Sequence, residues 1–263
     1  MTHPLFSICT LVTRPAQYND MLHSFAAAGF GDCEFLTIDN SNGNTLDGYQ
    51  GANYFLAHAS GKHIIICHQD IVLDFDNRID LEQRLAELTR LDPTWAVCGN
   101  AGLTSQGQNV IRISDPHSDD TRIGPFPSRV VGLDENFVVV RRTAELSVSP
   151  HLTGFHLYAT DLCCSAFAVG RSAYVIDFHL RHLSGGSAEG FDSALHNLAQ
   201  SMVNQPGPRL VGNTCGATFV GGPSWARRVG NRLLRSRLRP LAYHLPLWPT
   251  PTPTYQRLTT SRL

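Results

Sequence analysis

Long apolar runs are absent from this chain of 263 residues, and its seven cysteines have no regular spacing. No run approaches the roughly 18 apolar residues that a membrane-spanning helix needs. Residues 1–12 lack the basic start and long apolar stretch of a secretory signal. An odd number of scattered cysteines is typical neither of a disulfide framework nor of a zinc knuckle. We therefore expect a globular, cytoplasmic protein whose cysteines are reduced.

Acidic residues are absent from residue 223 onward, where eight of the 21 basic residues, all arginines, are found. The formal net charge of −1 therefore conceals a charge of −9 in the preceding residues. A basic segment attached to an acidic body predicts a chemically separate appendage. Because the body is acidic and no nucleic-acid-reading motif is present, we expect no nucleic acid partner.

The apolar content of 42% is enough for one large α/β domain or two small ones. Strand-like and helix-like patterns alternate, which predicts a mixed, mostly parallel sheet flanked by helices. The expected strands are Leu5–Val12, Glu34–Ile38, Lys62–Cys67, Trp95–Gly99, Val130–Arg142 and Ala173–Phe178. The expected helices are Pro15–Ala28, Thr45–Ala59, one around Leu81–Leu88, Ala159–Val169 and Ala188–Val203. Residues 100–129 are predicted to form a long loop or a hairpin.

Two successive strands end in acidic residues, Asp39 and Asp70. Open α/β sheets bind ligands beyond the carboxyl ends of their strands, so a binding site belongs here. Asp39 suits a nucleotide contact, but the Asn and Ser residues around it equally suit a helix cap or an Asx turn. Asp70 can help to hold a divalent cation that bridges two phosphates, or it can be a cap.

At this point the ordered motifs add information. Residues 35–41 (FLTIDNS), 51–53 (GAN), 59–61 (ASG) and 68–70 (HQD) resemble the donor half of family-2-like glycosyltransferases of the GT-A fold. The triplet HQD stands where the family has Asp-x-Asp, as in a branch with a His-Gln-Asp metal motif. The resemblance implies that the following residues bind the nucleotide-sugar donor: Thr13, Asp39, Asn40, Asn53 and Asp70.

The acceptor half also resembles this family, and the resemblance spans roughly residues 5 to 190. Its segments are 131–137 (VGLDENF), 154–163 (GFHLYATDLC) and 179–186 (HLRHLSGG). The resemblance implies that Asp161 is the catalytic base. The family usually has a Glu-Asp pair at this point, whereas this chain has Thr160 and Asp161. The resemblance also implies that His182 completes the metal site with Asp70. The residues expected to line the sugar and acceptor pocket are Asp134, Glu135, His156 and Tyr158.

Elementary chemistry agrees with these roles. Glycosyl transfer leaves negative charge on a diphosphate, which a cation, Mn²⁺ or Mg²⁺, held by Asp70 and His182 would stabilise. A carboxylate such as Asp161 can take the acceptor proton, typically a 10²- to 10⁴-fold effect, in a single inverting displacement. Other interpretations remain open: a helix cap for Asp161, an ordinary surface or core-edge histidine for His182, and a solvated strand end for residues 134–135.

The sequence therefore predicts a glycosyltransferase that uses a nucleoside diphosphate sugar and a hydroxyl acceptor on a glycan, a lipid-linked molecule or a protein. Two alternatives stay open. One is a nucleotidyltransferase or nucleotide-sugar hydrolase on a similar sheet. The other is a catalytically silent binding or scaffolding domain, which the departures at HQD and Thr-Asp leave possible.

We expect the chain to consist of a GT-A domain over residues 1–205 and a C-terminal extension over residues 206–263. Within the extension, Arg228, Arg232, Arg235 and Arg239 recur at helical spacing, which predicts a basic amphipathic helix over residues 225–239, ended by Pro240. Such a helix suits an anionic membrane surface, at the inner face of the membrane, or it packs on the acidic body. The Pro/Thr-rich residues 246–254 should be extended.

Overall fold

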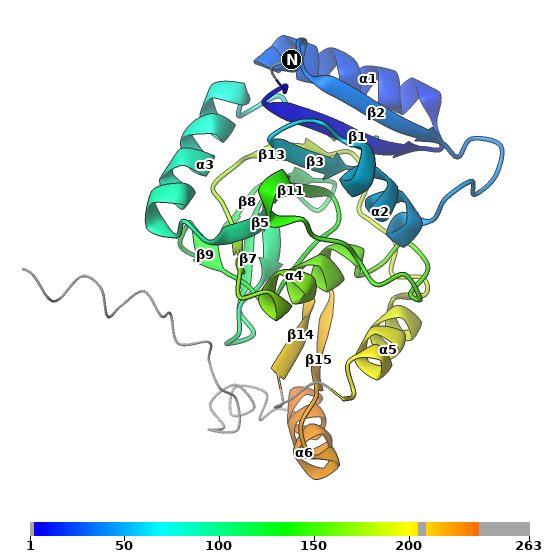
Figure 1. Cartoon of the computed structure of the whole chain (residues 1–263), viewed down its shortest axis with the longest axis vertical. Coiled ribbons are helices and arrows are strands. Elements are labelled where there is room, and N and C mark those ends of the chain that lie inside the picture. Colours follow the sequence, from blue (N-terminus) through cyan, green and yellow to red (C-terminus); the bar gives the residue numbers. More distant parts are fainter. Residues whose placement is uncertain (1–2, 205–208, 237–263) are drawn as a thin grey trace, which may run out of the picture.

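A computed structural model describes residues 3–204 and 209–236 (Figure 1). It contains a seven-stranded sheet of order β2-β1-β3-β11-β5-β12-β9, a second sheet of order β10-β6-β7-β13-β4 with β8 beside β7, and the hairpin β14-β15. The strands of the large sheet are β1 (Phe6–Val12), β2 (Glu34–Asp39), β3 (His63–Cys67), β5 (Trp95–Gly99), β9 (Ser128–Arg129), β11 (Phe137–Arg141) and β12 (Ser172–Val175).

The remaining elements complete the chain order. The second sheet has β4 (Ile71–Val72), β6 (Ala101–Leu103), β7 (Asn109–Asp115), β8 (Ser118–Ile123), β10 (Gly132–Leu133) and β13 (Leu180–His182), and the hairpin has β14 (Arg209–Asn213) and β15 (Gly216–Val220). The α-helices are α1 (Pro15–Phe25), α2 (Gly48–His58), α3 (Arg78–Leu91), α4 (Tyr158–Ala168), α5 (Phe191–Ser201) and α6 (Ser224–Leu234). A π-helical turn, Ala26–Phe30, extends α1, and a 3₁₀ turn, Arg142–Ala144, follows β11.

The predicted α/β class with a mixed sheet flanked by helices is confirmed. β1 pairs parallel with β2 and β3, and β5 pairs parallel with β12. β11 lies between β3 and β5 and is antiparallel to both. Residues 101–123 form β6, β7 and β8, so the hairpin interpretation of residues 100–129 is confirmed and the loop interpretation is wrong there.

The inner strands of the large sheet, such as β3 and β11, are buried on both faces. Most of their residues are apolar, and successive side chains point to opposite faces of the sheet. In β3, Ile64 and Ile66 pack in a cluster with residues of α2 and α4. Ile65 and Cys67 point the other way, into a cluster with residues of α1 and α3. The same alternation holds along β11. Two helical layers therefore fix β3, and with it the residues that follow its carboxyl end.

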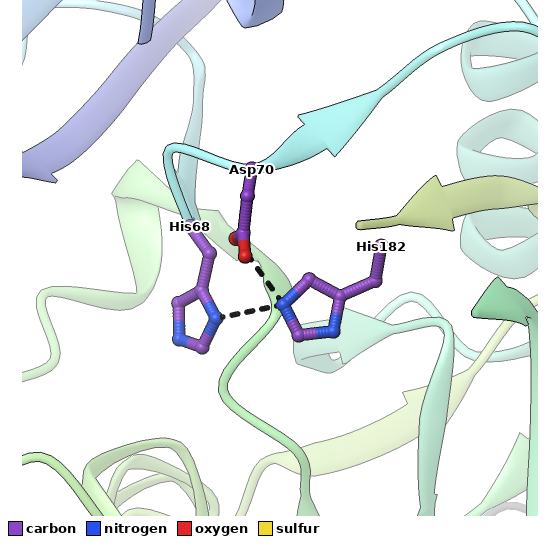
Figure 2. A group of neighbouring side chains, drawn as sticks. All are labelled: His68, Asp70 and His182. Atoms are coloured by element: carbon purple, nitrogen blue, oxygen red, sulfur yellow. Dashed lines mark hydrogen bonds and ion pairs between the residues drawn. The ribbon is translucent and has the colours of Figure 1, made fainter. Parts of the chain in front are cut away.

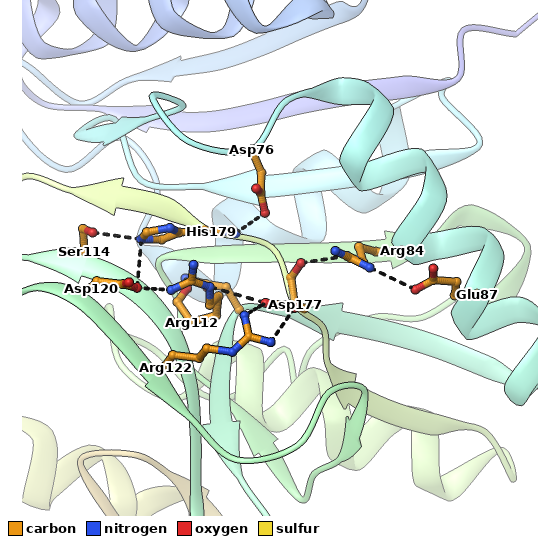
Figure 3. Close-up of polar contacts among 10 residues, drawn as sticks. Asp76, Arg84, Glu87, Arg112, Ser114, Asp120, Arg122, Asp177 and His179 are labelled. Atoms are coloured by element: carbon orange, nitrogen blue, oxygen red, sulfur yellow. Dashed lines mark hydrogen bonds and ion pairs between the residues drawn. The ribbon is translucent and has the colours of Figure 1, made fainter.

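A polar network fixes the segment that leads into β13 (Figure 3). Arg122 on β8 donates to both carboxylate oxygens of Asp177 at 2.9 Å, and Arg112 on β7 contacts the same carboxylate. The buried ring of His179 stacks on Phe75, with 3.8 Å between the ring centroids. These contacts hold residues 177–179, which directly precede β13, against β7 and β8.

The hairpin and α6 belong to the predicted extension, and both lie at the lower end of the molecule in Figure 1. The hairpin packs on the body so closely that a Cβ atom on Gly132 would overlap the carbonyl oxygen of Gly212. α6 ends at Leu234, whereas Arg239, Pro240 and residues 246–254 lie outside the described residues. No helix in the described part is long and apolar enough to cross a membrane.

Candidate metal and donor site

Three side chains meet at the carboxyl end of β3, an inner strand of the large sheet. His68 and Asp70 directly follow β3, in the turn that leads into β4. β13 pairs antiparallel with β4, with His182 opposite Ile71, and this pairing brings His182 to the same place. Figure 2 shows the two rings and the carboxylate facing one another. The group therefore lies where open α/β sheets bind their ligands.

The distances within this group are short. Nε2 of His182 lies 3.2 Å from Oδ1 of Asp70 and 3.3 Å from Nδ1 of His68. Burial, together with the neighbouring His182, lowers the pKa of His68 to about 4. Burial acts to raise the pKa of Asp70, but the hydrogen bond and charge of His182 outweigh it and hold that pKa well below its usual range. At neutral pH His68 is neutral and Asp70 is ionised, which are the forms that bind metal.

The donor set fits a divalent cation. One potential ligand atom from each of His68, Asp70 and His182 lies within 4.8 Å of the other two. Two imidazoles and one carboxylate suit a divalent transition metal. The predicted pair of Asp70 and His182 is in contact. The same group contains His68, the first residue of the HQD motif, which the sequence analysis did not include among the expected ligands. The signal for His68 was its place in the HQD motif, where the family has an acidic ligand.

Gln69, between the two ligands, joins this turn to the end of β1. Its Oε1 accepts hydrogen bonds from the backbone amides of Thr13 and Arg14 at 2.9 and 2.8 Å. Its Nε2 donates to the hydroxyl of Thr13 at 2.7 Å. Thr13, predicted to bind the donor, therefore lies beside the turn that contains His68 and Asp70, and Gln69 fixes the distance between them.

Asp39 ends β2 at the same edge of the sheet and is exposed. Its Oδ1 accepts hydrogen bonds from the hydroxyl of Ser41 at 2.6 Å and from the backbone amide of Ser41 at 2.8 Å. These bonds lower the pKa of Asp39. The Asx turn is therefore present, and the position also leaves Asp39 available to a nucleotide.

Two predicted donor residues instead organise the backbone. The side chain of Asn40 is buried; it accepts from the amides of Thr45 and Leu46 and donates to the carbonyl of Leu46. Asn53 exchanges two hydrogen bonds with the backbone of Val148 at 2.9 and 3.0 Å. Both side chains therefore organise the backbone around them. Their predicted contacts with the donor stay a prediction.

Asp134 and Glu135 form an acidic pair beneath the turn of the hairpin. Asp134 accepts hydrogen bonds from the hydroxyl and the amide of Thr214. Oε1 of Glu135 accepts from the amide of Leu157 at 2.8 Å. Burial, followed by the charge of Asp134, raises the pKa of Glu135 to about 8. Asp134 is partly buried and Glu135 is buried, so the alternative interpretation of a solvated strand end is wrong for these two residues.

His156 and Tyr158, predicted in the acceptor pocket, have different surroundings. The ring of His156 is partly exposed, and its Nε2 lies 2.8 Å from the carbonyl oxygen of Glu189. Tyr158 starts α4 and is 6% exposed, and its hydroxyl donates to the carbonyl of Glu135 at 3.2 Å. The hydroxyl of Tyr158 is thus used within the core. The acceptor contacts of His156 and Tyr158 stay predictions.

Asp161 lies in the first turn of α4 and is 2% exposed. Its two carboxylate oxygens accept from the backbone amide of Ser149 at 2.6 Å and from the hydroxyl of Ser149 at 3.0 Å. Burial raises the pKa of Asp161 despite these bonds. The carboxylate therefore anchors the segment around Ser149 to α4, and its role as catalytic base stays a prediction.

The sheet order, the two helical layers and the polar group at the end of β3 define a fold of the GT-A glycosyltransferase type. TarS of S. aureus is similar to this chain with a TM-score of 0.50 at 13% identity, over 76% of this chain and 40% of TarS. The mannosyltransferase PcManGT of Pyrobaculum calidifontis, solved with GDP-Man and Mn²⁺, gives 0.47 at 11% identity, over 77% of this chain and 63% of that chain. This chain thus spans less than two thirds of either protein, and the likeness shows the fold alone.

No protein-family profile matches the chain. The chain belongs to the same family as the protein called ATP synthase subunits region ORF 6 of Fuscovulum blasticum. The two are 36% identical over 231 residues, which cover 83% of this chain and 91% of that protein. That name states no activity, so the function has to be argued from the site.

Proposed function

We propose that this protein is a family-2-like glycosyltransferase that moves a sugar from a nucleoside diphosphate to a hydroxyl acceptor, with inversion. The observation that carries the proposal is the group formed by His68, Asp70 and His182 at the carboxyl end of β3. In a fold of the GT-A type, this edge of the sheet is the expected place for a nucleotide and its cation.

The donor would lie across the ends of three strands. Asp39 is exposed at the end of β2, Thr13 follows β1, and Asp70 follows β3. β2, β1 and β3 are parallel neighbours, so these three residues share one edge of the sheet. We place the nucleoside near Asp39 and the diphosphate toward the histidines, with Gln69 holding the two parts of the site in register.

The cation is proposed to be Mn²⁺ in preference to Mg²⁺. Mg²⁺ selects oxygen ligands and keeps several waters, whereas imidazole nitrogens suit transition metals. The ligands proposed are His68, Asp70 and His182. When bound, the cation would supply stabilisation of the negative charge on the departing diphosphate.

We propose Glu135 as the proton acceptor in place of Asp161. Both oxygens of Asp161 are occupied by Ser149, whereas the hydrogen bond from Leu157 occupies only one oxygen of Glu135. Glu135 also belongs to the acidic pair next to His182, whose charge acts on Asp134. A carboxylate with a raised pKa is a stronger base once it is ionised, which suits removal of a proton from a hydroxyl.

The acceptor is proposed to enter beside the hairpin turn. A hollow of about 750 Å³ lies between α5, β15 and α6, and Cys215 lines it. Cys215 is exposed and directly follows Thr214, which donates two hydrogen bonds to Asp134, so the acidic pair lies near this end of the hollow. A hydroxyl delivered through this opening would reach the acidic pair.

The test is a turnover assay of the full chain with a panel of nucleoside diphosphate sugars, Mn²⁺ and a mixture of simple glycan and lipid-linked acceptors. The proposal predicts that one donor is consumed, that nucleoside diphosphate appears only when acceptor is present, and that Asp70→Asn abolishes this. Release of free sugar without acceptor would identify a hydrolase, and release of a nucleoside monophosphate would identify cleavage of the diphosphate; either result would overturn the proposal.

A further inference from the structure

α6 has one face that is fixed to the hairpin. Ala226 is 1% exposed, and a Cβ atom on Gly230 would lie 2.6 Å from the ring of Phe219. Oδ1 of Asn231 accepts from the amide of Phe219 at 2.7 Å and lies 3.1 Å from the hydroxyl of Thr218. The helix is therefore attached to β15 by small residues and by an amide, and not by its arginines.

The opposite face of α6 is exposed and carries two kinds of side chain. At 3.6 residues per turn, the exposed residues fall on one side of the helix. These residues are Trp225, Arg228, Val229, Arg232 and Arg235. The tryptophan is 54% exposed and the valine 44%, so an apolar strip lies beside a row of guanidinium groups.

The charges on this face are not neutralised by the protein. Within residues 3–204 and 209–236, Arg228, Arg232 and Arg235 form no ion pair or hydrogen bond, and α6 has no acidic residue. The neighbouring Arg227 differs, since it turns inward and donates to the carbonyl of Gly222 at 2.7 Å. The structure thus distinguishes one arginine that stabilises the fold from three that are presented to solvent.

We propose that this face of α6 docks on an anionic lipid bilayer. Guanidinium groups bind lipid phosphates, and a tryptophan beside them favours the boundary between headgroups and acyl chains. The residues before 223 carry a net charge of −9, so the rest of the protein is repelled by such a surface and α6 is turned toward it. The packed face does not take part, so docking requires no unfolding. This inference goes beyond the transfer reaction and does not depend on it.

The arginines alone would equally suit a nucleic acid. The apolar strip of Trp225 and Val229 favours a lipid bilayer over a nucleic acid. A duplex offers phosphates but no apolar phase for Trp225 and Val229, whereas a bilayer offers both. Lipid binding should therefore depend on the tryptophan as well as on the arginines. Binding to a duplex would depend on the arginines only.

The experiment is co-sedimentation of the full chain with vesicles of phosphatidylcholine alone or mixed with phosphatidylglycerol. We expect binding to the mixed vesicles only, and Arg228→Glu/Arg232→Glu should weaken it by about 30-fold or more, since each cation contributes about fivefold. Trp225→Ser should weaken binding in low and high salt alike. Arg228→Lys/Arg232→Lys should retain it.

The matched control is Lys62→Glu/Arg90→Glu, which makes the same change of charge at exposed residues outside α6. It should bind as the unmodified chain does. All variants change exposed side chains, and circular dichroism with thermal unfolding checks that each is folded. Equal binding to both kinds of vesicle, equal loss in the control, or tighter binding to duplex DNA than to the mixed vesicles would overturn the proposal.

Discussion

Both carboxylate oxygens of Asp161 accept hydrogen bonds from a single residue, Ser149, at 2.6 and 3.0 Å. The contact joins the first turn of α4 to the segment that precedes it, in a place where Asp161 is almost fully buried. Glu135 has a different environment: its carboxyl accepts hydrogen bonds from backbone amides, including that of Leu157, and has a neighbouring carboxylate. The two acids should therefore respond differently to replacement by their amides.

Asp161→Asn should mainly reduce stability. The amide replaces one acceptor by a donor beside the groups of Ser149, and a buried group left unpaired costs about 1–3 kcal/mol. Glu135→Gln should leave stability and donor affinity nearly unchanged and should lower kcat by about 10²- to 10⁴-fold. Urea unfolding together with steady-state kinetics distinguishes the two variants. The reverse pattern would reassign the proton acceptor to Asp161.

The pH dependence of the reaction gives an independent check on Glu135. Because its pKa is raised to about 8, the ionised form that accepts a proton increases as pH rises through that value. The rate constant kcat should therefore rise from pH 6.5 to about 8 and then level off. The slope should disappear from the residual activity of Glu135→Gln. A profile that is flat in the unmodified chain would contradict this assignment.

The close approach of Gly132 and Gly212 predicts an effect on stability. A methyl group at residue 132 would overlap the carbonyl of Gly212 and crowd the side chain of Thr160. Overpacking of this kind costs about 1–3 kcal/mol. Gly132→Ala should lower the free energy of unfolding by that amount. Gly31→Ala is the control, because its Cβ would meet no atom within 4 Å and its φ is −65°. Equal effects in the two variants would show that the hairpin does not pack on the body.

His63 makes the stability of the protein depend on pH. Burial lowers its pKa to about 4, with Arg141 and Lys62 adding to the effect. Between pH 6.5 and 4 the unfolded chain binds a proton at this residue and the folded chain does not, so stability falls as pH falls through that window. The loss is about 3 kcal/mol at most.

His63→Phe removes this titration and keeps a flat ring against Trp95, on which His63 stacks. With chelator present, its loss of stability from pH 6.5 to 4 should be smaller by about 3 kcal/mol. His68 also has a pKa lowered to about 4, so part of the acid sensitivity should remain. His196→Gln, at an exposed position of α5, should behave as the unmodified chain. An unchanged pH dependence in His63→Phe would show that His63 is protonated in the folded state.

Much of the fold follows from local patterns in the sequence. The alternating environments of Ile64 to Cys67 come from a buried strand with helices on both sides, and a run of apolar residues predicts such a strand. The hairpin over residues 209–220 was not predicted. Its position depends on the contact of Gly212 with Gly132, which is distant in sequence and leaves no periodic signal.

The site was predictable only where its residues follow from local patterns in the sequence. The placement of Asp70 at a strand end could be derived locally, whereas His182 could be assigned only through resemblance, because it reaches Asp70 by the pairing of β13 with β4. His68 was not among the expected ligands because it stands where the family motif has an acidic residue, and the sequence does not show how its ring is directed. The partner of Asp161, Ser149, could not be foreseen, since the segment that contains it has no regular structure.

The central claim is that His68, Asp70 and His182 hold a cation that helps to bind a nucleoside diphosphate. Isothermal titration calorimetry with UDP, GDP, ADP, CDP and dTDP, with Mn²⁺ and after chelation, tests it most directly. Asp70→Asn is the test variant and Asp20→Asn, an exposed carboxylate on α1, is its control. We predict that one nucleotide binds in Mn²⁺ only, that Asp70→Asn weakens it by at least about tenfold, and that the control does not. Binding that is equally tight without metal or in Asp70→Asn, or no binding of any of the five, would contradict the account.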